Sequence, residues 1–229
     1  FLSKLRYLRA DWQGAEDALA KVRQKPNDDI RHEVYAHQIN LAIRQDNLEL
    51  AKTLLKKQKP SKDWLPYVYY NLGSAYARLG KFDETIEYYE KLAANPYPTD
   101  ELRALYDKAM TSAGYAYLVT EQYQKAIDQF SRVRLTSALS NRALLGYGWA
   151  AARLEQYKEA LKPWQYLAKS TLLDENSQEA LVAVPYAYEK LGSEGLALEH
   201  FQVAEQAFLD ELVRLDGVID SMKGNQLLE

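Results

Sequence analysis

The chain of 229 residues carries a formal net charge of −3, is 47% hydrophobic and 27% charged, and contains no cysteine. A chain of this length buries enough surface to fold without a disulfide or a structural metal, and the missing cysteines exclude thiol catalysis and thiolate metal sites. The slight acidic excess argues against a dedicated nucleic-acid binder, and no apolar run approaches the roughly 18 residues that a membrane span needs.

One pattern recurs along the chain: a mostly aromatic or apolar residue, a small residue three positions later, and a bulky residue four positions after that. The six instances are Trp12/Ala15/Leu19, Leu48/Ala51/Leu55, Phe82/Thr85/Tyr89, Tyr123/Ala126/Phe130, Tyr157/Ala160/Trp164 and Glu194/Ala197/Phe201. Two of the intervals between successive instances are 34 residues. A small residue lets two helices approach closely and a bulky residue one turn on fills the next gap, so the pattern predicts an array of helical hairpins.

The segment from Tyr67 to Pro96 shows such a hairpin most clearly. An apolar stripe at helical spacing is interrupted by Gly80, a second stripe follows, and Pro96 ends it. The two stripes consist of Tyr69, Leu72, Tyr76 and Leu79, and of Phe82, Ile86, Tyr89 and Leu92. Because steps of three and four residues define one helix face, the segment predicts a helix, a tight turn and a second helix.

This segment resembles the tetratricopeptide repeat family, in which W-x-x-L-G-x-x-Y on a first helix precedes A-x-x-x-F-x-x-A on a second. Here Tyr69-x-x-Leu72-Gly73-x-x-Tyr76 matches the first motif, and Thr85, Tyr89 and Leu92 stand in the second. The resemblance implies an all-α fold, a right-handed superhelical solenoid of antiparallel helix pairs. We expect a single array over 1–229, with repeats at about 1–26 (partial), 28–60, 64–96, 99–137, 139–173 and 176–210, and a helical extension over 211–229.

Three departures from the repeat carry information. The longest interval between repeats predicts a lengthened first helix capped by Thr99 or Asp100. Pro163 and Pro185 fall within helical stripes, where each should kink or break its helix. The last stripe comprises Phe201, Ala204, Phe208, Leu212, Leu215, Ile219 and Met222. It predicts a long final helix that either caps the open end of the array or forms a dimer or inter-domain surface.

Two motifs that look like chemistry are better explained by helix structure. His32 and His37, in HEVYAH, are five residues apart, so on a helix their rings diverge by about 140° and do not share a metal. Gly146 to Ala151 has the letters of a dinucleotide fingerprint, but it falls within a predicted helix rather than between a strand and a helix. We therefore expect no catalytic site, no cofactor and no bound metal.

In tetratricopeptide arrays the first helix of each repeat lines the concave face, and the resemblance indicates which positions point there. In this sequence those positions are rich in aromatic and basic residues, the types enriched at binding hot spots. The predicted groove residues are Asn40, Arg44, Tyr67, Tyr70, Arg78, Tyr115, Trp149, Arg153 and Tyr186. The alternative is that several of these tyrosines pack against neighbouring repeats and bind no ligand.

We interpret the chain as a non-catalytic protein-protein interaction scaffold that binds a protein or an extended peptide in its concave groove. The alternative is a regulatory or polysaccharide-contacting array attached to a catalytic or secretion module, because aromatic faces also stack on sugars. A homodimer through the C-terminal helix is a further expectation, and nucleic acid is not an expected partner. The absence of cysteine and the start at Phe1 rather than Met favour a processed protein of the bacterial periplasm or cell envelope.

Overall fold

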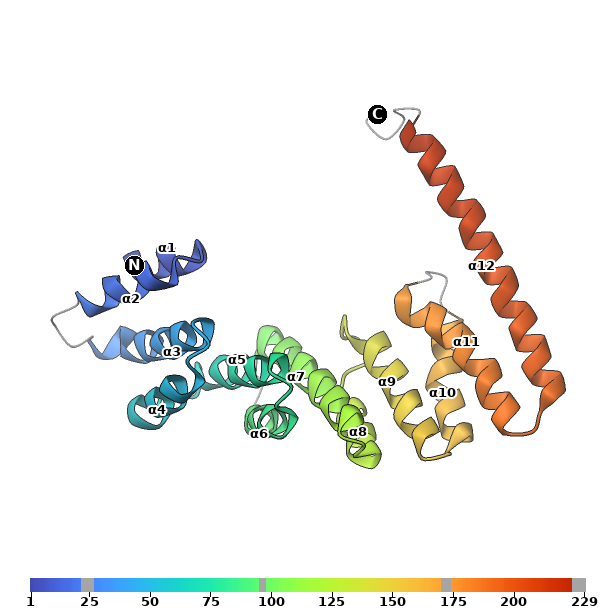
Figure 1. Ribbon diagram of the computed structural model, residues 1–229, viewed down its shortest axis with the longest axis horizontal. Coiled ribbons are helices and arrows are strands. Elements are labelled where there is room, and N and C mark those ends of the chain that lie inside the picture. Colours follow the sequence, from blue (N-terminus) through green and yellow to red (C-terminus); the bar gives the residue numbers. More distant parts are fainter. Residues whose placement is uncertain (22–26, 95–97, 170–173, 224–229) are drawn as a thin grey trace. The chain divides into compact units, whose positions relative to one another are not determined.

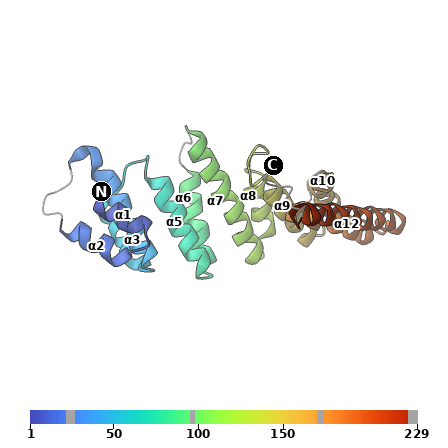
Figure 2. The same ribbon diagram turned by 90° about the horizontal axis from the view of Figure 1, so that it is seen from above.

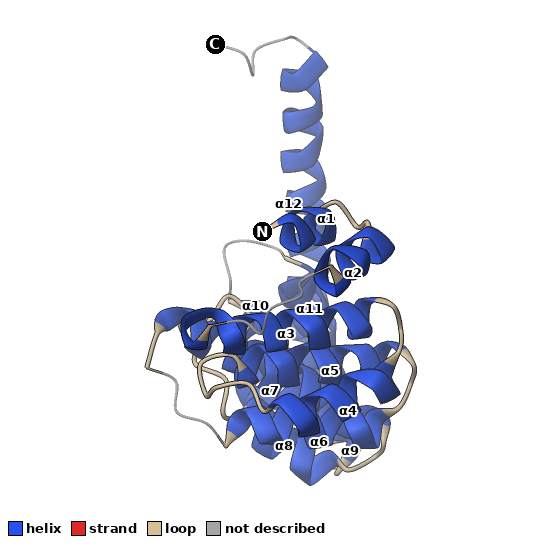
Figure 3. Cartoon of the chain, turned by 90° about the vertical axis from the view of Figure 1, so that its left-hand side faces the viewer, coloured by secondary structure: helices blue, strands red, loops and turns tan. Residues whose placement is uncertain are grey.

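A computed structural model describes residues 1–21, 27–94, 98–169 and 174–223, without the side chains of Asp28, Asp29 and Lys223 (Figure 1). In these ranges the helices are α1 (Leu2–Leu8), α2 (Trp12–Ala20), α3 (Asp28–Arg44), α4 (Leu48–Gln58), α5 (Leu65–Arg78), α6 (Phe82–Ala93), α7 (Asp100–Val119), α8 (Tyr123–Phe130), α9 (Ser140–Arg153), α10 (Tyr157–Ala168), α11 (Glu175–Lys190) and α12 (Glu194–Lys223). Turns and loops join them, and the described residues form no strand (Figure 3). The prediction of an all-α array of helix pairs with a long C-terminal helix is confirmed.

The chain forms two compact units, Phe1–Thr120 and Glu121–Glu229. In the first unit α1 packs on α2, α3 on α4 and α5 on α6, so consecutive helices form hairpins. The first helices of successive hairpins also contact one another, α3 with α5 and α5 with α7, and Figure 2 shows α5, α6 and α7 side by side. In the second unit α8 to α12 pack in succession, and α9 also contacts α11.

The hairpins share one turn geometry. Each turn places one residue in the left-handed region with φ between 56° and 70°, and these residues are Ala10, Asp46, Gly80, Glu121, Glu155 and Gly192. A backbone bond then closes the turn, as in the 3.0 Å bond from Lys81 N to Tyr76 O. A glycine adopts this conformation without a steric penalty, which explains why Gly80 ends one helix and allows the next to begin.

The small residues of the recurring pattern are buried between helices. Ala15, Ala51, Thr85, Ala126, Ala160 and Ala197 are each at most 5% exposed. Thr85 donates its hydroxyl to Lys81 O at 2.9 Å, so this buried polar group is satisfied. On α9, a Cβ added to Gly148 would lie 2.1 Å from the Trp164 indole. The fingerprint-like segment that contains Gly148 therefore serves close helix packing, in agreement with its position inside a helix.

The predicted departures from the repeat have different outcomes. α7 spans 20 residues, against 14 for α5, and Thr99 caps it by accepting the Leu102 N–H at 3.2 Å. The prediction was a kink or a break at each proline. α10 and α11 continue through Pro163 and Pro185, so neither helix is broken, and a kink at either position stays a prediction. Both prolines are buried, and packing against neighbouring helices outweighs the backbone hydrogen bond that each one removes.

Two further expectations concern helix ends and membranes. Pro96, the predicted end of the second helix in its hairpin, lies outside the described residues, and α6 ends at Ala93. In the described part of the chain, no helix combines the length and the apolar character that crossing a membrane requires.

Candidate functional site

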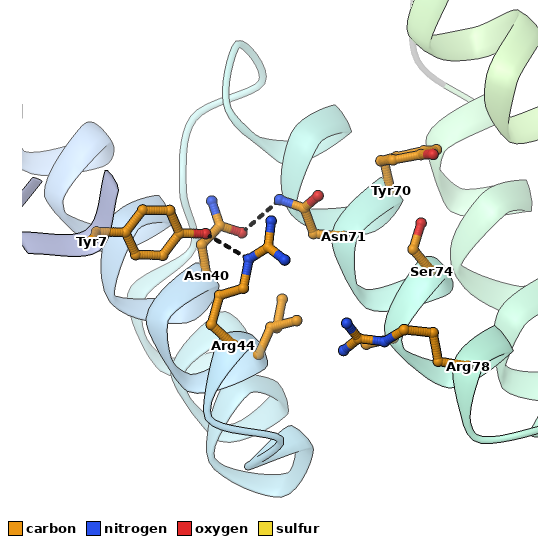
Figure 4. A pocket seen from close by; sticks show the side chains of 9 residues that line it. Tyr7, Asn40, Arg44, Tyr70, Asn71, Ser74 and Arg78 are labelled. Carbon is orange, nitrogen blue, oxygen red and sulfur yellow. Dashed lines mark hydrogen bonds between the residues drawn. The ribbon is translucent and has the colours of Figure 1, made fainter. Parts of the chain in front are cut away.

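A pocket of about 240 Å³ opens between α1, α3 and α5 of the first unit (Figure 4). Its lining residues are Tyr7, Asn40, Ile43, Arg44, Tyr70, Asn71, Ser74, Ala75 and Arg78. Four of the predicted groove residues, Asn40, Arg44, Tyr70 and Arg78, are among them. The structure therefore brings together side chains from two successive hairpins that the family resemblance had placed on one face.

Helical spacing explains why these side chains meet. Asn40 and Arg44 are one turn apart on α3, and Ser74 and Arg78 are one turn apart on α5. The two helices contact each other over a common apolar core in which Leu72 is fully buried. Because buried and polar positions alternate around each helix, the packing that joins α3 to α5 also presents the polar side chains to the pocket.

Hydrogen bonds fix the orientation of the polar side chains. Arg44 donates from Nε to the Tyr7 hydroxyl at 3.2 Å, and its guanidinium carbon lies 5.9 Å from the Trp12 ring centroid. Asn71 donates from Nδ2 to Asn40 Oδ1 at 3.0 Å, which links α5 to α3. Figure 4 shows both bonds close to the Arg44 guanidinium. The arginine is therefore held by the Tyr7 hydroxyl and the neighbouring Trp12 ring.

The pocket is positively charged within a chain whose net charge is −3. Its lining includes two arginines and no acidic residue. Arg78 pairs with Asp46 at 3.3 Å, but the two side chains are 57% and 74% exposed, so this ion pair is weak. Lys108 of α7 adds a third cation, with Nζ 5.1 Å from the Tyr70 ring centroid. Such a site favours an anionic group on its ligand.

The floor of the pocket is neutral. Ser74 shares a 3.0 Å hydrogen bond with the hydroxyl of Tyr89. Tyr89 is 1% exposed, and burial raises the pKa of its hydroxyl, which therefore stays protonated. The positive charge of the site comes from arginine side chains, which remain charged across the physiological pH range.

Two other predicted groove residues of the first unit lie outside this lining. Tyr67 is half-buried on α5, and burial followed by a hydrogen bond to Glu101 raises the pKa of its hydroxyl. Tyr115 is half-buried on α7. Both belong to the first helices of their hairpins, as expected from the sequence.

In the second unit the predicted residues Trp149 and Tyr186 belong to an aromatic cluster. Their ring centroids are 6.1 Å apart, and the Trp149 ring meets the buried Trp164 edge-on at 4.9 Å. The Trp149 indole N–H donates to Glu179 Oε1 at 2.5 Å, so the ring is fixed on both sides. Arg153, the third predicted residue of this unit, is exposed at the end of α9. Trp149 is thus half-buried, and part of its surface packs against the core.

Sequence reasoning did not identify Tyr7 and Asn71 as site residues. Tyr7 was missed because the first repeat showed almost no first helix, whereas α1 spans Leu2–Leu8 and carries this side chain. Asn71 lies next to the motif residue Leu72, in a position that the family pattern leaves open. The spacing from Asn40 to Asn71 is 31 residues and differs from the 34-residue period, so it gave no signal for their pairing.

The histidine pair has a structural role in α3. His37 lies 2.8 Å from the Ser3 hydroxyl, whereas His32 meets Tyr35 edge-on with 6.2 Å between ring centroids. Within the described ranges, no three side chains of the metal-binding types gather at one place. The absence of a bound metal stays a prediction.

Comparisons with known proteins point to one family. Residues 66–91, which cover most of α5 and α6, match the model of the tetratricopeptide repeat. No curated protein matches the chain at a significant level. Among solved structures, MamA AMB-1 is 24% identical with a TM-score of 0.57, over 80% of this chain and 94% of that chain.

Other MamA structures give a similar result. MamA 41-end from Desulfovibrio magneticus RS-1 is 20% identical with a TM-score of 0.55, over 80% of this chain and 96% of its own. A further crystal structure of MamA is 16% identical with a TM-score of 0.55, over 93% of this chain and 97% of its own. At these identities the likeness shows a shared fold.

The successive helical hairpins and the matched segment define an all-α helical repeat fold. Within this fold, the hairpin of α5 and α6 is the segment that matches the tetratricopeptide repeat.

Proposed function

We propose that the chain is a non-catalytic scaffold whose first-helix faces bind a partner protein through an extended peptide segment. The pocket of the first unit supports this most, because Asn40, Arg44, Tyr70 and Arg78 converge there from two successive repeats. Arginine and tyrosine side chains dominate the energy of many binding interfaces. A ligand that contacts α3 and α5 together has to cross from one repeat to the next, as an extended chain does.

The aromatic cluster of the second unit supports a further contact surface. Trp149 is held by the hydrogen bond to Glu179 and by its contact with Trp164, so it loses little side-chain entropy when a ligand binds. Lys190 lies over the Tyr186 ring at 5.6 Å and adds a cation beside the cluster. Aromatic faces with a neighbouring cation suit a peptide that carries apolar and acidic side chains.

Peptide selection tests this function. Phage-displayed random peptides of 12 residues are selected on the immobilised chain, and the selected sequences are synthesised for affinity measurements. We expect Trp149→Ala to weaken the binding of peptides that contact the second unit roughly 30-fold, because central aromatic anchors contribute most of the affinity. Lys56→Ala, an exposed position in the last turn of α4, serves as the control and should leave affinity unchanged. Circular dichroism verifies that both variants are folded.

Two outcomes would contradict the proposal. If no peptide is enriched while oligosaccharides bind the chain, the polysaccharide-contacting alternative is correct. If a folded Trp149→Ala variant binds every selected peptide as the wild type does, the second-unit cluster is a packing feature and takes no ligand.

The long C-terminal helix supports a homodimer as a second kind of interaction. Ala197 and Ala204 are at most 5% exposed, so the first half of α12 packs on α11 and covers the end of the array. Beyond Phe208 the apolar side chains of the stripe are exposed. The exposed fractions of Leu212, Leu215, Ile219 and Met222 are 59%, 41%, 46% and 60%. Their steps of three and four residues are those of a coiled-coil seam, which pairs with a second copy of the helix.

Light scattering on the purified chain tests the homodimer. We expect the mass of a dimer for the chain of 229 residues and the mass of a monomer after truncation behind Glu211. A monomeric chain of 229 residues at micromolar concentration would assign the stripe to another domain or partner instead.

A further inference from the structure

The apolar stripe of α12 continues towards the N-terminus of the helix before Phe208. At the same steps of three and four residues, Leu198, Phe201 and Glu205 precede Phe208. Leu198 and Phe201 are 61% and 44% exposed, so they lie on the side of α12 that faces solvent and not on the side that packs on α11. The α12 seam is the full set of these positions from Leu198 to Met222.

The length of the α12 seam suits a pair of helices. Its eight positions cover about three and a half heptads, a length that is typical of a coiled coil, and all of them except Glu205 are apolar. The seam extends roughly 36 Å along the helix axis at a rise of 1.5 Å per residue. Figure 1 shows the C-terminal half of α12 extending beyond α11. A second copy of the chain presents the same seam, so the pairing of two copies covers apolar side chains on both of them.

Glu205 distinguishes the two directions in which such helices can pair. In a parallel pair in register, each seam residue faces its own copy, so the two Glu205 carboxylates would meet within an apolar interface. Like charges that are close together in such an interface repel each other, because little water screens them. A single charged seam position therefore disfavours the parallel pair.

An antiparallel pair with full overlap of the two seams avoids this contact. Leu198 then faces the partner's Met222, and Glu205 faces the partner's Leu215. The two Glu205 carboxylates are roughly 15 Å apart along the axis, which is more than the Debye length of about 8 Å at physiological ionic strength. A shift by one heptad would also separate the carboxylates, but it would leave Leu198 and Phe201 outside the interface.

The charged residues beside the seam are compatible with this antiparallel arrangement. Exposed Asp216 lies next to the partner's Gln202, a neutral amide, whereas a parallel pair would place it next to the partner's Glu211. Near the centre of the antiparallel pair Glu211 meets its own copy. Arg214 of the same helix already donates to both oxygens of Glu211, at 2.7 and 2.5 Å, and so compensates this charge.

We propose that two copies of the chain pair through α12 as an antiparallel coiled coil, with the two seams overlapping from Leu198 to Met222. This inference rests on the homodimer proposed above and adds the direction and the register of its helices.

Distances between spin labels on the chain of 229 residues test the inference. The sequence contains no cysteine, so Ser221→Cys and Val213→Cys each attach one label per copy, at exposed positions outside the seam. In the proposed register, electron paramagnetic resonance should give a label separation of roughly 35 Å for Ser221→Cys, near the end of α12. Val213→Cys, near the centre, is the matched control and should give roughly 15–20 Å. Circular dichroism and light scattering verify that both labelled variants are folded and dimeric.

The contrary results separate the inference from the homodimer on which it rests. A dimer with less than about 20 Å between the labels at both positions is parallel, so the inference fails while the homodimer stands. A separation of roughly 25 Å for Ser221→Cys corresponds to the shift by one heptad and overturns the proposed register. A monomeric chain without coupling between labels at either position contradicts the homodimer, and the inference fails with it.

Discussion

Replacing Gly148 with alanine adds one methyl group where α9 packs on α10. A Cβ at this position would lie 2.1 Å from Nε1, 2.5 Å from Cε2 and 2.6 Å from Cδ1 of Trp164, whereas carbon atoms in contact are about 3.5–4.0 Å apart. The indole would have to retreat by roughly 1 Å or more. Trp164 cannot easily do so, because it is fully buried and its Nε1 donates to Leu145 O at 3.3 Å.

The expected effect on stability is a balance of two terms. Overpacking of a core typically lowers the free energy of unfolding by about 1–3 kcal/mol. The exchange of glycine for alanine inside a helix raises it by about 0.5–1 kcal/mol. We therefore expect Gly148→Ala to lower the stability of the second unit by about 1–2 kcal/mol.

Urea denaturation followed by circular dichroism and tryptophan fluorescence measures this difference. Gly217→Ala on α12 is the matched control, because a Cβ there meets nothing within 4 Å and only the gain in helix propensity remains. Adding Trp164→Phe to Gly148→Ala removes the nearest ring atom, so the double variant should be more stable than the sum of the single effects predicts. If Gly148→Ala and Gly217→Ala are equally stable, α9 and α10 do not pack as closely as the structure indicates.

Three other changes have expected outcomes. Ala160→Leu should lower the free energy of unfolding by about 1–3 kcal/mol in the same urea assay, because it overpacks a position that is 0% exposed; an unchanged midpoint would contradict its burial. Burial, followed by the charge of Lys4, lowers the pKa of His37, so stability should decrease as the pH falls below about 6.5, and His37→Gln should remove this part of a thermal-melt pH profile. Burial raises the pKa of Tyr88 to about 12, so stability should decrease as the pH rises from about 10 towards that value, and Tyr88→Phe should weaken this decrease.

The hairpins were predictable from the sequence because their determinants are local and repeated. A small residue followed by a bulky residue one turn later indicates a place where two helices pack closely. Gly80 indicates a turn, because glycine adopts the left-handed conformation without a steric penalty. The other turns were harder to locate, since Asp46 and Glu155 adopt the same left-handed conformation without being glycine. Pro163 was misjudged for a related reason: local propensity favours a break, but the burial that opposes it depends on neighbouring helices.

The binding site was predictable only in part, because its residues lie between the motif positions. Asn40 and Arg44 could be placed by counting along a repeat. Tyr7 and Asn71 could not, since their role depends on which side chains of α1, α3 and α5 meet in space. A single sequence contains helical periodicity but no record of such pairings across repeats.

Motif residues and site residues differ in burial, so experiments can separate their effects on stability and on binding. Motif residues such as Leu72 are fully buried and hold the hairpins together, whereas Arg44 is exposed and makes one hydrogen bond, to Tyr7, within the part of the chain that the structure describes. Stability and binding should therefore respond to different substitutions. Gly148→Ala should shift the urea midpoint, and Arg44→Gln should change the affinity for peptides selected on the immobilised chain at an almost constant midpoint. If Arg44→Gln destabilised the chain by as much as Gly148→Ala, the arginine would be part of the packing between α1 and α3, and its assignment to a binding site would be wrong.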